Sequence, residues 1–374
     1  MALFSKPLKN IKVLDFTRLI PGPFCTKILS DLGADVIKIE DLNRGDYVNA
    51  FAPHVFGKES VLNVYFNKNK KRFKLDCKNP AGQDVILKLV KKADVLVESF
   101  RPGVMKTMGL DYAKLKKINS KLVYASITGF GQDGALAHKA GHDLNFLAVS
   151  GLMTLHDKVP QYQLGDFVAG GFMATFAIQS ALMERARTRQ GRYLDVSMTE
   201  GLSFLAQHLH FSAHAVELGA IQGVLARYQI YVTSDGKRVA LAAFEEKFWQ
   251  KFCDLLHRPD WKTAGHEPAR NASLIQELRR EFATRTANEW RKFAEEHDVC
   301  LTMESDKGDL RRLGLLKSVE VACEGEKLKF EETSLFGGAP KQSYARSGQH
   351  NVTILKSFGF TAKQIADLKK QGVI

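Results

Sequence analysis

The chain has 374 residues, and its 54 lysines and arginines exceed its 41 aspartates and glutamates, which gives a formal net charge of +13. A hydrophobic content of 45% excludes disorder as the main state, and the length predicts about two domains because single cores stop growing near ~250–300 residues. The excess charge indicates an anionic partner, which composition leaves open between nucleic acid, a membrane surface and a phosphorylated small molecule.

The first third of the chain alternates predicted strands and helices. Residues 11–17 form an apolar run typical of a buried strand, and a helix follows the proline-glycine turn at 21–23 and ends near Leu32. Residues 35–40 predict a second strand. This βαβ unit requires a parallel sheet covered by helices. Further strands are predicted at 72–76, 94–98 and 122–128.

A helix is predicted over 80–92, with Asn79 as its N-cap and Pro80 in its first turn. Beyond a glycine-rich region, from 129 to 171, the pattern continues with helices, strands and a hairpin. The predicted ranges are a helix at 170–186, a strand at 193–198, a helix at 199–218, a hairpin at 228–243 and a capped C-terminal helix within 360–374, with Thr361 and Gln364 as its capping box.

These elements predict an α/β fold with a Rossmann-like parallel sheet in a large domain and a smaller α+β domain. We expect the large domain over 1–200, a linker helix over 201–227 and the small domain over 228–325. Residues 326–374 are expected to return to the large domain.

Targeting and redox signals are few. No stretch reaches the ~18 unbroken apolar residues of a membrane span, and the N-terminus lacks the apolar core and cleavage site of a secretory signal. The five cysteines are odd in number and widely spaced, which disfavours a disulfide framework or a thiolate zinc site. We therefore expect a cytoplasmic protein.

Gly129, Gly131 and Gly134 have the G-x-G-x-x-G spacing of dinucleotide-binding loops and follow a predicted strand. Binding a dinucleotide there needs a helix that begins at the loop, so that its N-terminus faces the pyrophosphate. Residues 135–143 lack apolar periodicity. We therefore expect a glycine-rich active-site loop and no NAD.

Two polar patterns favour structural roles. His210 and His214 share a helix face near His208, but no glutamate completes a zinc-binding pattern, so we expect no metal. The basic run at 68–72 has few aromatic neighbours and no accompanying nucleic-acid-binding motif. A solvated face is therefore favoured over a nucleic-acid site.

Several segments together resemble the family III CoA-transferases, which include the α-methylacyl-CoA racemases. They occur in the family's order over nearly the whole chain. The matching segments are 13–40 (VLDFTRLIPGPFCTKILSDLGADVIKIE), 100–112 (FRPGVMKTMGLDY), 124–134 (YASITGFGQDG), 140–153 (AGHDLNFLAVSGLM), 164–171 (LGDFVAGG), 191–201 (GRYLDVSMTEG), 242–256 (AAFEEKFWQKFCDLL) and 348–374.

Two of these segments resemble the racemase branch more than the transferase branch: the PGPFC turn at 21–25, and the GHD motif at 141–143 with Asn145 after it. Transferases are expected to lack a histidine at the position of His142. Asp166 does not discriminate, since the resemblance implies a nucleophile in transferases and an acid or base in racemases.

Inverting the carbon next to a thioester requires a base on one face and an acid on the other, and imidazole and carboxylate groups suit both tasks. The resemblance assigns these roles to His142 and Asp166. The enolate oxygen needs N–H donors, for which we expect the backbone of Asp143, with Gly141 allowing close approach. Purely structural roles remain as alternatives: a hydrogen-bonded loop histidine for His142 and a helix N-cap for Asp166.

The resemblance also implies a glutamate that supports the histidine, and Glu245 matches it, although Glu246 is adjacent. The same resemblance implies an interlocked homodimer in which Glu245 reaches the site from the opposite chain. No cofactor is expected beyond the CoA moiety of an acyl-CoA substrate, and no metal.

For CoA itself, the resemblance points to Arg101 as a contact, to Lys70 and Lys71 near the nucleotide, and to the backbone of Leu75 near the adenine. Arg44 is a weaker candidate. Three segments depart from the family pattern, at 41–43, 224–227 and 301–303.

From the matching motifs we expect a 2-methylacyl-CoA racemase. A CoA-transferase is the main alternative, and a NAD-binding or nucleic-acid-binding protein is the outside alternative.

Overall fold

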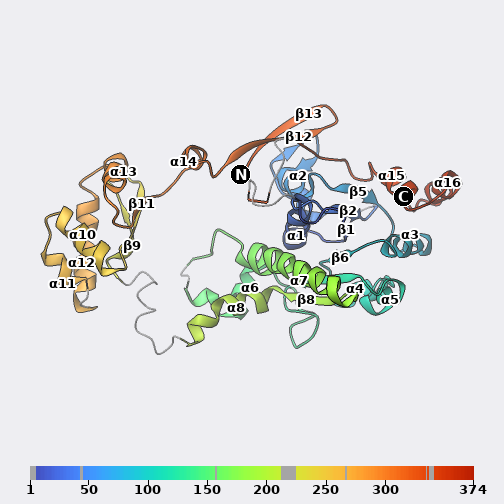
Figure 1. The fold of residues 1–374 in the computed structure, drawn as a ribbon, viewed down its shortest axis with the longest axis horizontal. Helices are drawn as coiled ribbons and strands as arrows, with labels where there is room; N and C mark the ends of the chain where they lie inside the picture. Colours follow the sequence, from blue (N-terminus) through green and yellow to red (C-terminus); the bar gives the residue numbers. More distant parts are fainter. Residues whose placement is uncertain are drawn as a thin grey trace. The chain divides into compact units, whose positions relative to one another are not determined.

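The computed structural model describes residues 6–42, 45–155, 158–211, 225–265, 268–333, 335–336 and 341–374. The chain forms two compact units. A large unit contains residues 1–206 and 315–374, and a small unit contains 207–314 (Figure 1). The return to the large unit therefore begins at Leu315, earlier than the predicted 326.

The large unit is built on a sheet of six parallel strands in the order β5-β2-β1-β6-β7-β8. The strands are β1 (Lys12–Asp15), β2 (Asp35–Glu40), β5 (Lys71–Lys74), β6 (Val95–Glu98), β7 (Val123–Thr128) and β8 (Tyr193–Ser197). The predicted parallel α/β fold is confirmed. From β1 the chain first adds strands on one side and then, from β6, on the other. The β1–β6 boundary is thus the switch point, where ligands bind in such folds.

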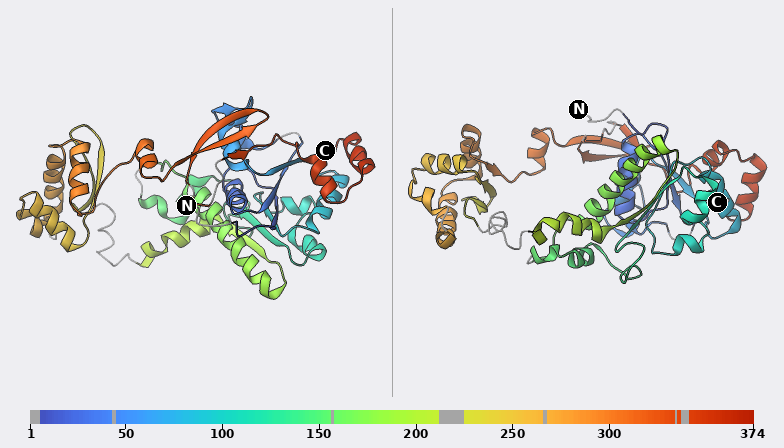
Figure 2. Two further views of the ribbon diagram at one scale, coloured as in Figure 1. Left: turned by 45° about the horizontal axis from the view of Figure 1, so that its top comes forward. Right: turned by 60° about the horizontal axis from the view of Figure 1, so that its bottom comes forward.

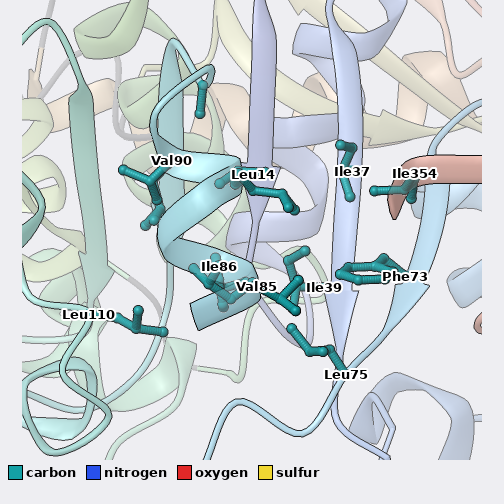
Figure 3. Packing of buried hydrophobic residues seen from close by; sticks show 14 of the residues in the cluster. Leu14, Ile37, Ile39, Phe73, Leu75, Val85, Ile86, Val90, Leu110 and Ile354 are labelled. Carbon is teal, nitrogen blue, oxygen red and sulfur yellow. The ribbon is translucent and has the colours of Figure 1, made fainter. Parts of the chain in front are cut away.

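Helices cover both faces of this sheet (Figure 2). On one face, α1 (Pro21–Asp31) and α7 (Met173–Thr188) contact each other and the strands. On the other face, the main apolar cluster combines strand residues such as Ile37 and Phe73 with Ile86 and Ile354 of the covering helices (Figure 3). Burying each such side chain contributes about 1.5–3 kcal/mol. These covering helices are α3 (Pro80–Val90), α5 (Tyr112–Ile118), α15 (Asn351–Ser357) and α16 (Ala362–Lys370).

The C-terminal segment completes the large unit at the β5 edge. Arg72 on β5 pairs with Glu40 on β2 and donates to the hydroxyl of Tyr344, and all three side chains are buried. Two predicted caps are confirmed. Asn79 accepts from the N–H of Ala81, and Thr361 forms a capping box with Gln364.

The remaining elements of the large unit are short. They are η1 (Tyr47–Ala50), β3 (His54–Val55), β4 (Glu59–Ser60), α2 (Val61–Asn67), α4 (Val104–Thr107), α6 (Asp143–Ser150), η2 (Leu152–Leu155), β12 (Lys317–Cys323), β13 (Glu326–Glu332) and β14 (Lys341–Ser343). The helix α8 (Met198–Phe211) follows β8 and ends at the last residue described before 225.

The helix predicted from residue 170 begins earlier, with a π-helical segment η3 (Gly165–Phe172) that continues into α7. This segment packs on α1, and a Cβ added at Gly171 would lie 2.5 Å from the ring of Phe24, so the contact needs glycine. By length and composition alone, Gly165–Thr188 is apolar enough to cross a membrane. No segment of this kind is predicted from the sequence. In the large unit it is a sheet-covering helix.

The small unit contains a three-stranded antiparallel sheet in the order β11-β10-β9 and five helices within its described residues. The predicted hairpin is confirmed by β9 (Tyr228–Val232) and β10 (Arg238–Ala242), joined through Gly236 at φ +74°. Trp249, Trp261 and Trp290 are fully buried in its core. The other elements are α10 (Glu246–Leu255), α11 (Asp260–Ala264), α12 (Pro268–Phe282), α13 (Ala287–Glu296), β11 (Leu301–Met303) and α14 (Lys307–Arg312).

Candidate active site at the carboxyl ends of the strands

A cavity of about 470 Å³ lies in the large unit, at the carboxyl ends of the strands beside the switch point. The loops that follow β1, β6 and β7 line it, together with the start of η3. Four of the predicted site residues lie on its wall: Arg101, Gly141, His142 and Asp166. Residues separated by as much as 65 positions in the chain therefore meet where a parallel sheet places its ligands.

Asp166 is the most strongly perturbed acid of this cavity. Burial raises the pKa of its carboxyl group to about 7, and the negative charge of Asp143 adds to the rise. The N-cap role considered for Asp166 is wrong, because Leu164 occupies the N-cap and Asp166 lies inside the first turn of η3. A carboxyl group with this pKa can both accept and donate a proton near neutral pH.

Asp143 is the first residue of α6 and is 7% exposed. Its Oδ1 accepts the backbone N–H of Asp166 at 2.9 Å. Burial raises the pKa of Asp143, while the N–H groups of Asp166 and Gly165 oppose the rise. A Cβ added at Gly165 would lie 2.7 Å from the same oxygen, which explains why glycine precedes Asp166. The N–H of Asp143 has no acceptor within its helix, since it belongs to the first turn.

His142 is the N-cap of α6 and is exposed on the cavity wall. Its backbone N–H donates to Oδ1 of Asn145 at 3.0 Å. His142 of the GHD motif and the asparagine after this motif therefore cap the helix that begins there. Gly141 fits tightly, because a Cβ there would lie 2.8 Å from the ring of Phe146 and 3.1 Å from that of Phe130. These contacts fix the backbone that carries His142.

Glu245 and Glu246 begin α10 in the small unit, and their contacts distinguish them. Glu246 pairs with Arg227 at 3.4 Å and accepts from Gln250, both within its own unit. Glu245 is the N-cap, with its carbonyl accepting from Phe248. Both side chains are exposed, and among the described residues an ion pair is found for Glu246 but not for Glu245.

The prediction for Lys70 is wrong in detail, because its ammonium group lies in the interior. Lys70 Nζ donates to Asp15 at 3.0 Å, to the hydroxyl of Thr26, to the carbonyl of Pro23 and to Asn67. The side chain is fully buried, and burial lowers its pKa to about 8. These bonds hold β1, α1 and the end of α2 together, which is a structural role.

The other CoA candidates are spread out. Lys71 pairs with Asp35 at 2.8 Å where β5 and β2 begin. This pair lies at the amino ends of the strands, whereas the cavity lies at their carboxyl ends. Leu75 follows β5, with its side chain in the core and its N–H bonded to Glu40. Arg101 is exposed on the cavity wall. Arg44 lies outside the described residues.

Two cations of the cavity were not predicted, Arg18 and Lys139. Arg18 is the only charged residue in the loop between β1 and α1, a position that usually faces the ligand in this fold. That topological signal could have identified it. Lys139 lies in the glycine-rich loop without a distinguishing pattern.

The loop with G-x-G-x-x-G spacing continues without a helix until Asp143. The helix N-terminus that dinucleotide binding requires is therefore missing at Gly134. Across the described residues, no group of three or more metal-ligating side chains is found. His208 and His210 fall within α8, and His214 lies outside the described residues.

Comparisons with known proteins agree on one family. A family model described as CoA-transferase family III matches residues 8–334. The chain is 34% identical to the acetyl-CoA:oxalate CoA-transferase of Acetobacter aceti over 76% of this chain and 77% of that one. It is 29% identical to the alpha-methylacyl-CoA racemase of Mus musculus over 98% and 97% of the two chains.

Among solved structures, a CAIB/BAIF family protein from Brucella suis resembles the chain with a TM-score of 0.76 and 27% identity. The match covers 94% of this chain and 99% of that one. The agreement therefore extends over nearly the whole chain.

Proposed function

The chain belongs to CoA-transferase family III, and we propose that it racemises 2-methylacyl-CoA thioesters. Its relatives include both CoA-transferases and racemases. The observation that carries this proposal is the cavity wall shared by His142 and Asp166, in which Asp166 has a pKa of about 7. An acid that exchanges its proton near neutral pH suits a reaction that must run in both directions.

In the proposed reaction, one of these groups removes the proton from the carbon next to the thioester. The electron pair moves onto the thioester oxygen and forms an enolate, which the N–H of Asp143 stabilises. The other group then donates a proton to the opposite face of the same carbon, so the net change is inversion. In the reverse direction the base and the acid exchange roles.

CoA transfer is the second candidate, favoured by the identity to the acetyl-CoA:oxalate CoA-transferase. There the ionised Asp166 would attack the thioester carbonyl and expel the CoA thiolate. The thiolate would attack the Asp166 carbonyl of the resulting anhydride, which releases the first acid and leaves CoA as a thioester on Asp166. A second carboxylate would then take up CoA through the same two steps in reverse and regenerate the Asp166 carboxylate. A nucleophile must be ionised, and so must a general base, so a pKa of about 7 is compatible with both roles of Asp166. The racemase reaction differs in that it also uses the protonated form.

We propose the interlocked homodimer as the working assembly, with Glu245 of one copy supporting His142 of the other. The large unit has an apolar surface over η3, α7 and α8 that suits burial against a second copy. On it, Phe176 and Met183 are 68% and 74% exposed, and Phe172 and Phe204 lie beside a cavity of about 680 Å³. A cytoplasmic location completes the proposal, in agreement with five unpaired cysteines.

Co-expression of Asp166→Asn and Glu245→Gln chains tests this assembly. If each site combines two chains, half of the dimers are mixed and each has one intact site, so about a quarter of the wild-type activity returns. No recovery over the separate variants would contradict a shared site.

The reaction itself is tested by incubating the protein with one enantiomer of a 2-methylacyl-CoA in D₂O. A racemase incorporates deuterium at the α-carbon as optical activity is lost, and Asp166→Asn abolishes both. Retained configuration without deuterium, together with acyl exchange onto an added carboxylic acid, would establish the transferase in its place.

A further inference from the structure

Arg18 occupies the loop between β1 and α1 on the wall of the active-site cavity. Its side chain is half-buried and lies between two aromatic rings. The guanidinium carbon is 5.3 Å from the ring centre of Phe100 and 5.8 Å from that of Tyr47. A guanidinium can make such cation–π contacts through its face while its N–H donors bind a ligand.

The backbone on both sides of Arg18 is fixed by side chains that lie far from it in the sequence. The N–H of Arg18 donates to the hydroxyl of Ser99 at 2.9 Å, and the N–H of Leu19 donates to Oδ1 of Asp46 at 2.9 Å. Lys38 donates to the carbonyl of Thr17. Leu19 has φ +65°, a conformation that persists in a branched residue only where the surroundings hold it.

The backbone beside each aromatic ring is also fixed. Asp46 is the N-cap of η1, accepting from the N–H of Val48 at 3.1 Å, and so it places Tyr47 next in the chain. Glu98, at the end of β6, accepts the N–H of Phe100 at 2.7 Å. The position of the Arg18 guanidinium is thus set before any ligand binds, which lowers the entropic cost of binding.

Within the described part of the chain, Arg18 has no carboxylate within ion-pair distance. Two acids that contact this loop have other cationic partners: Asp46 lies 3.5 Å from Lys38, and Asp15 lies 3.0 Å from Lys70. Arg101, on the same cavity wall, likewise forms no ion pair among these residues. Two guanidinium groups without an ion-pair partner among the described residues therefore face one cavity.

We propose that Arg18 is a phosphate-binding residue of this site and that, with Arg101, it binds the pyrophosphate of CoA, while Asp46 is its positioning residue. This assignment rests on the proposed function, since it takes acyl-CoA as the ligand. Two guanidinium groups match the two charges of a pyrophosphate, and each can form paired hydrogen bonds with one phosphate group.

The test compares the dissociation constants of CoA, of dephospho-CoA, which lacks only the 3′-phosphate, and of pantetheine, which has no phosphate. In Arg18→Gln we expect CoA and dephospho-CoA to weaken by the same factor, between about 10-fold and 100-fold, as for one or two charge-assisted hydrogen bonds. Pantetheine binding should not change. Arg18→Lys should lie between wild type and Arg18→Gln.

Arg189→Gln is the matched control, because it removes the same charge from an exposed site at the amino ends of the strands. All three ligands should bind this variant as they bind the wild type. Asp46→Asn should weaken CoA and dephospho-CoA to a smaller extent and leave pantetheine unchanged. A purely structural role for Asp46 would weaken all three together.

Unchanged CoA binding in Arg18→Gln would overturn the assignment, as would a loss for CoA that dephospho-CoA does not share. An equal loss for pantetheine would place Arg18 at the pantetheine or acyl end of the ligand and would also overturn it. If wild-type protein binds none of the three ligands, the proposed function itself fails, which is a distinguishable result.

Discussion

One cavity lies at the amino ends of the strands of the central sheet and another at their carboxyl ends. The larger of these two cavities is not the candidate site. The cavity at the amino ends of the strands has about 730 Å³, compared with about 470 Å³ at the carboxyl ends. It is also rich in cations. These are Lys91, Lys92, Lys121, Arg185 and Arg189.

Three of the cations at the amino ends of the strands, Lys91, Arg185 and Arg189, have a structural explanation. Lys91 is the C-cap of α3 and Arg189 that of α7, where basic side chains offset the partial negative charge of a helix C-terminus. Arg185 pairs with Asp94 at 3.0 Å and donates to the carbonyl of Lys121. These charges already have a structural purpose.

At the carboxyl edge the charged groups are placed differently. Asp166 is buried beside a second acid, and Arg18 is held between rings without an ion-pair partner in the described residues. Such arrangements cost stability and are retained for function. The comparison teaches that cavity size and positive charge do not identify this site, whereas charges left uncompensated by the fold do.

The sharpest test of the comparison is removal of the buried acid. Asp166→Asn should lower kcat by about 10²–10⁴-fold, because it removes an acid–base group, and a transferase would lose its nucleophile at the same position. Steady-state kinetics with acyl-CoA would show this. Asp94→Asn at the amino edge is the control and should keep its activity.

His142→Gln is expected to have the next largest effect. It preserves size and hydrogen bonding but removes proton transfer, so deuterium incorporation should fall by about 10²-fold or more. Acyl transfer, which the resemblance assigns to Asp166 alone, should survive. A variant with full racemase activity would exclude His142 from the reaction.

Arg101→Gln should change binding rather than chemistry. We expect about a 10-fold higher dissociation constant for CoA, since one charge-assisted contact is lost, with a much smaller change in kcat. Calorimetric titration checks this, with Arg189→Gln as the matched control. Equal binding by both variants would remove Arg101 from the CoA site.

Asp143→Asn should move the pH dependence of the reaction. The charge of Asp143 raises the pKa of Asp166, so its removal lowers that pKa from about 7 toward the usual range of aspartate. The limb of the kcat profile that reports Asp166 should shift to lower pH. A profile that stays in place would show that Asp166 does not control it.

Asp166 also links pH to stability. Its pKa is raised in the folded state, so the protonated form is favoured by folding, and this contribution is full below about pH 4 and is lost as the pH rises through about 7. Asp166→Asn should therefore raise the melting temperature at pH 8 relative to wild type, and by more than the corresponding difference at pH 6.

The smallest effect is expected at the amino edge. The double variant Lys121→Gln and Arg189→Gln should retain kcat and CoA binding, and each lost cation should cost about 0.3–1 kcal/mol of stability. Thermal unfolding measures that cost. A substantial loss of activity would show that this edge takes part in function and would undo the comparison.

Features set by neighbouring residues were predictable from the sequence. The βαβ order, the Asn79 and Thr361 caps and the 228–242 hairpin depend on patterns within a few positions and are confirmed. Lys70 was misjudged because its burial depends on Asp15, 55 residues away. The early start of η3 was missed because it depends on Asp143, whose carboxylate accepts an N–H 23 residues further on.

The candidate site was found through ordered family motifs, not through local physics. Nothing within the 164–171 segment indicates that Asp166 is buried with a pKa near 7, because that depends on packing around Asp143. Likewise the choice between Glu245 and Glu246 depends on Arg227, which lies on a different element.

The tie between Arg72, Glu40 and Tyr344 has a consequence for synthesis on the ribosome. The small unit is one continuous stretch, 207–314, whereas the core begun by β1 is completed only by α15 and α16 from the end of the chain. Phe73 and Leu75 therefore lack their contacts with α15 and α16 while the 275 intervening residues, 76–350, are translated. The nascent chain most needs chaperone protection during that interval, because the strands are synthesised early but their core is completed late.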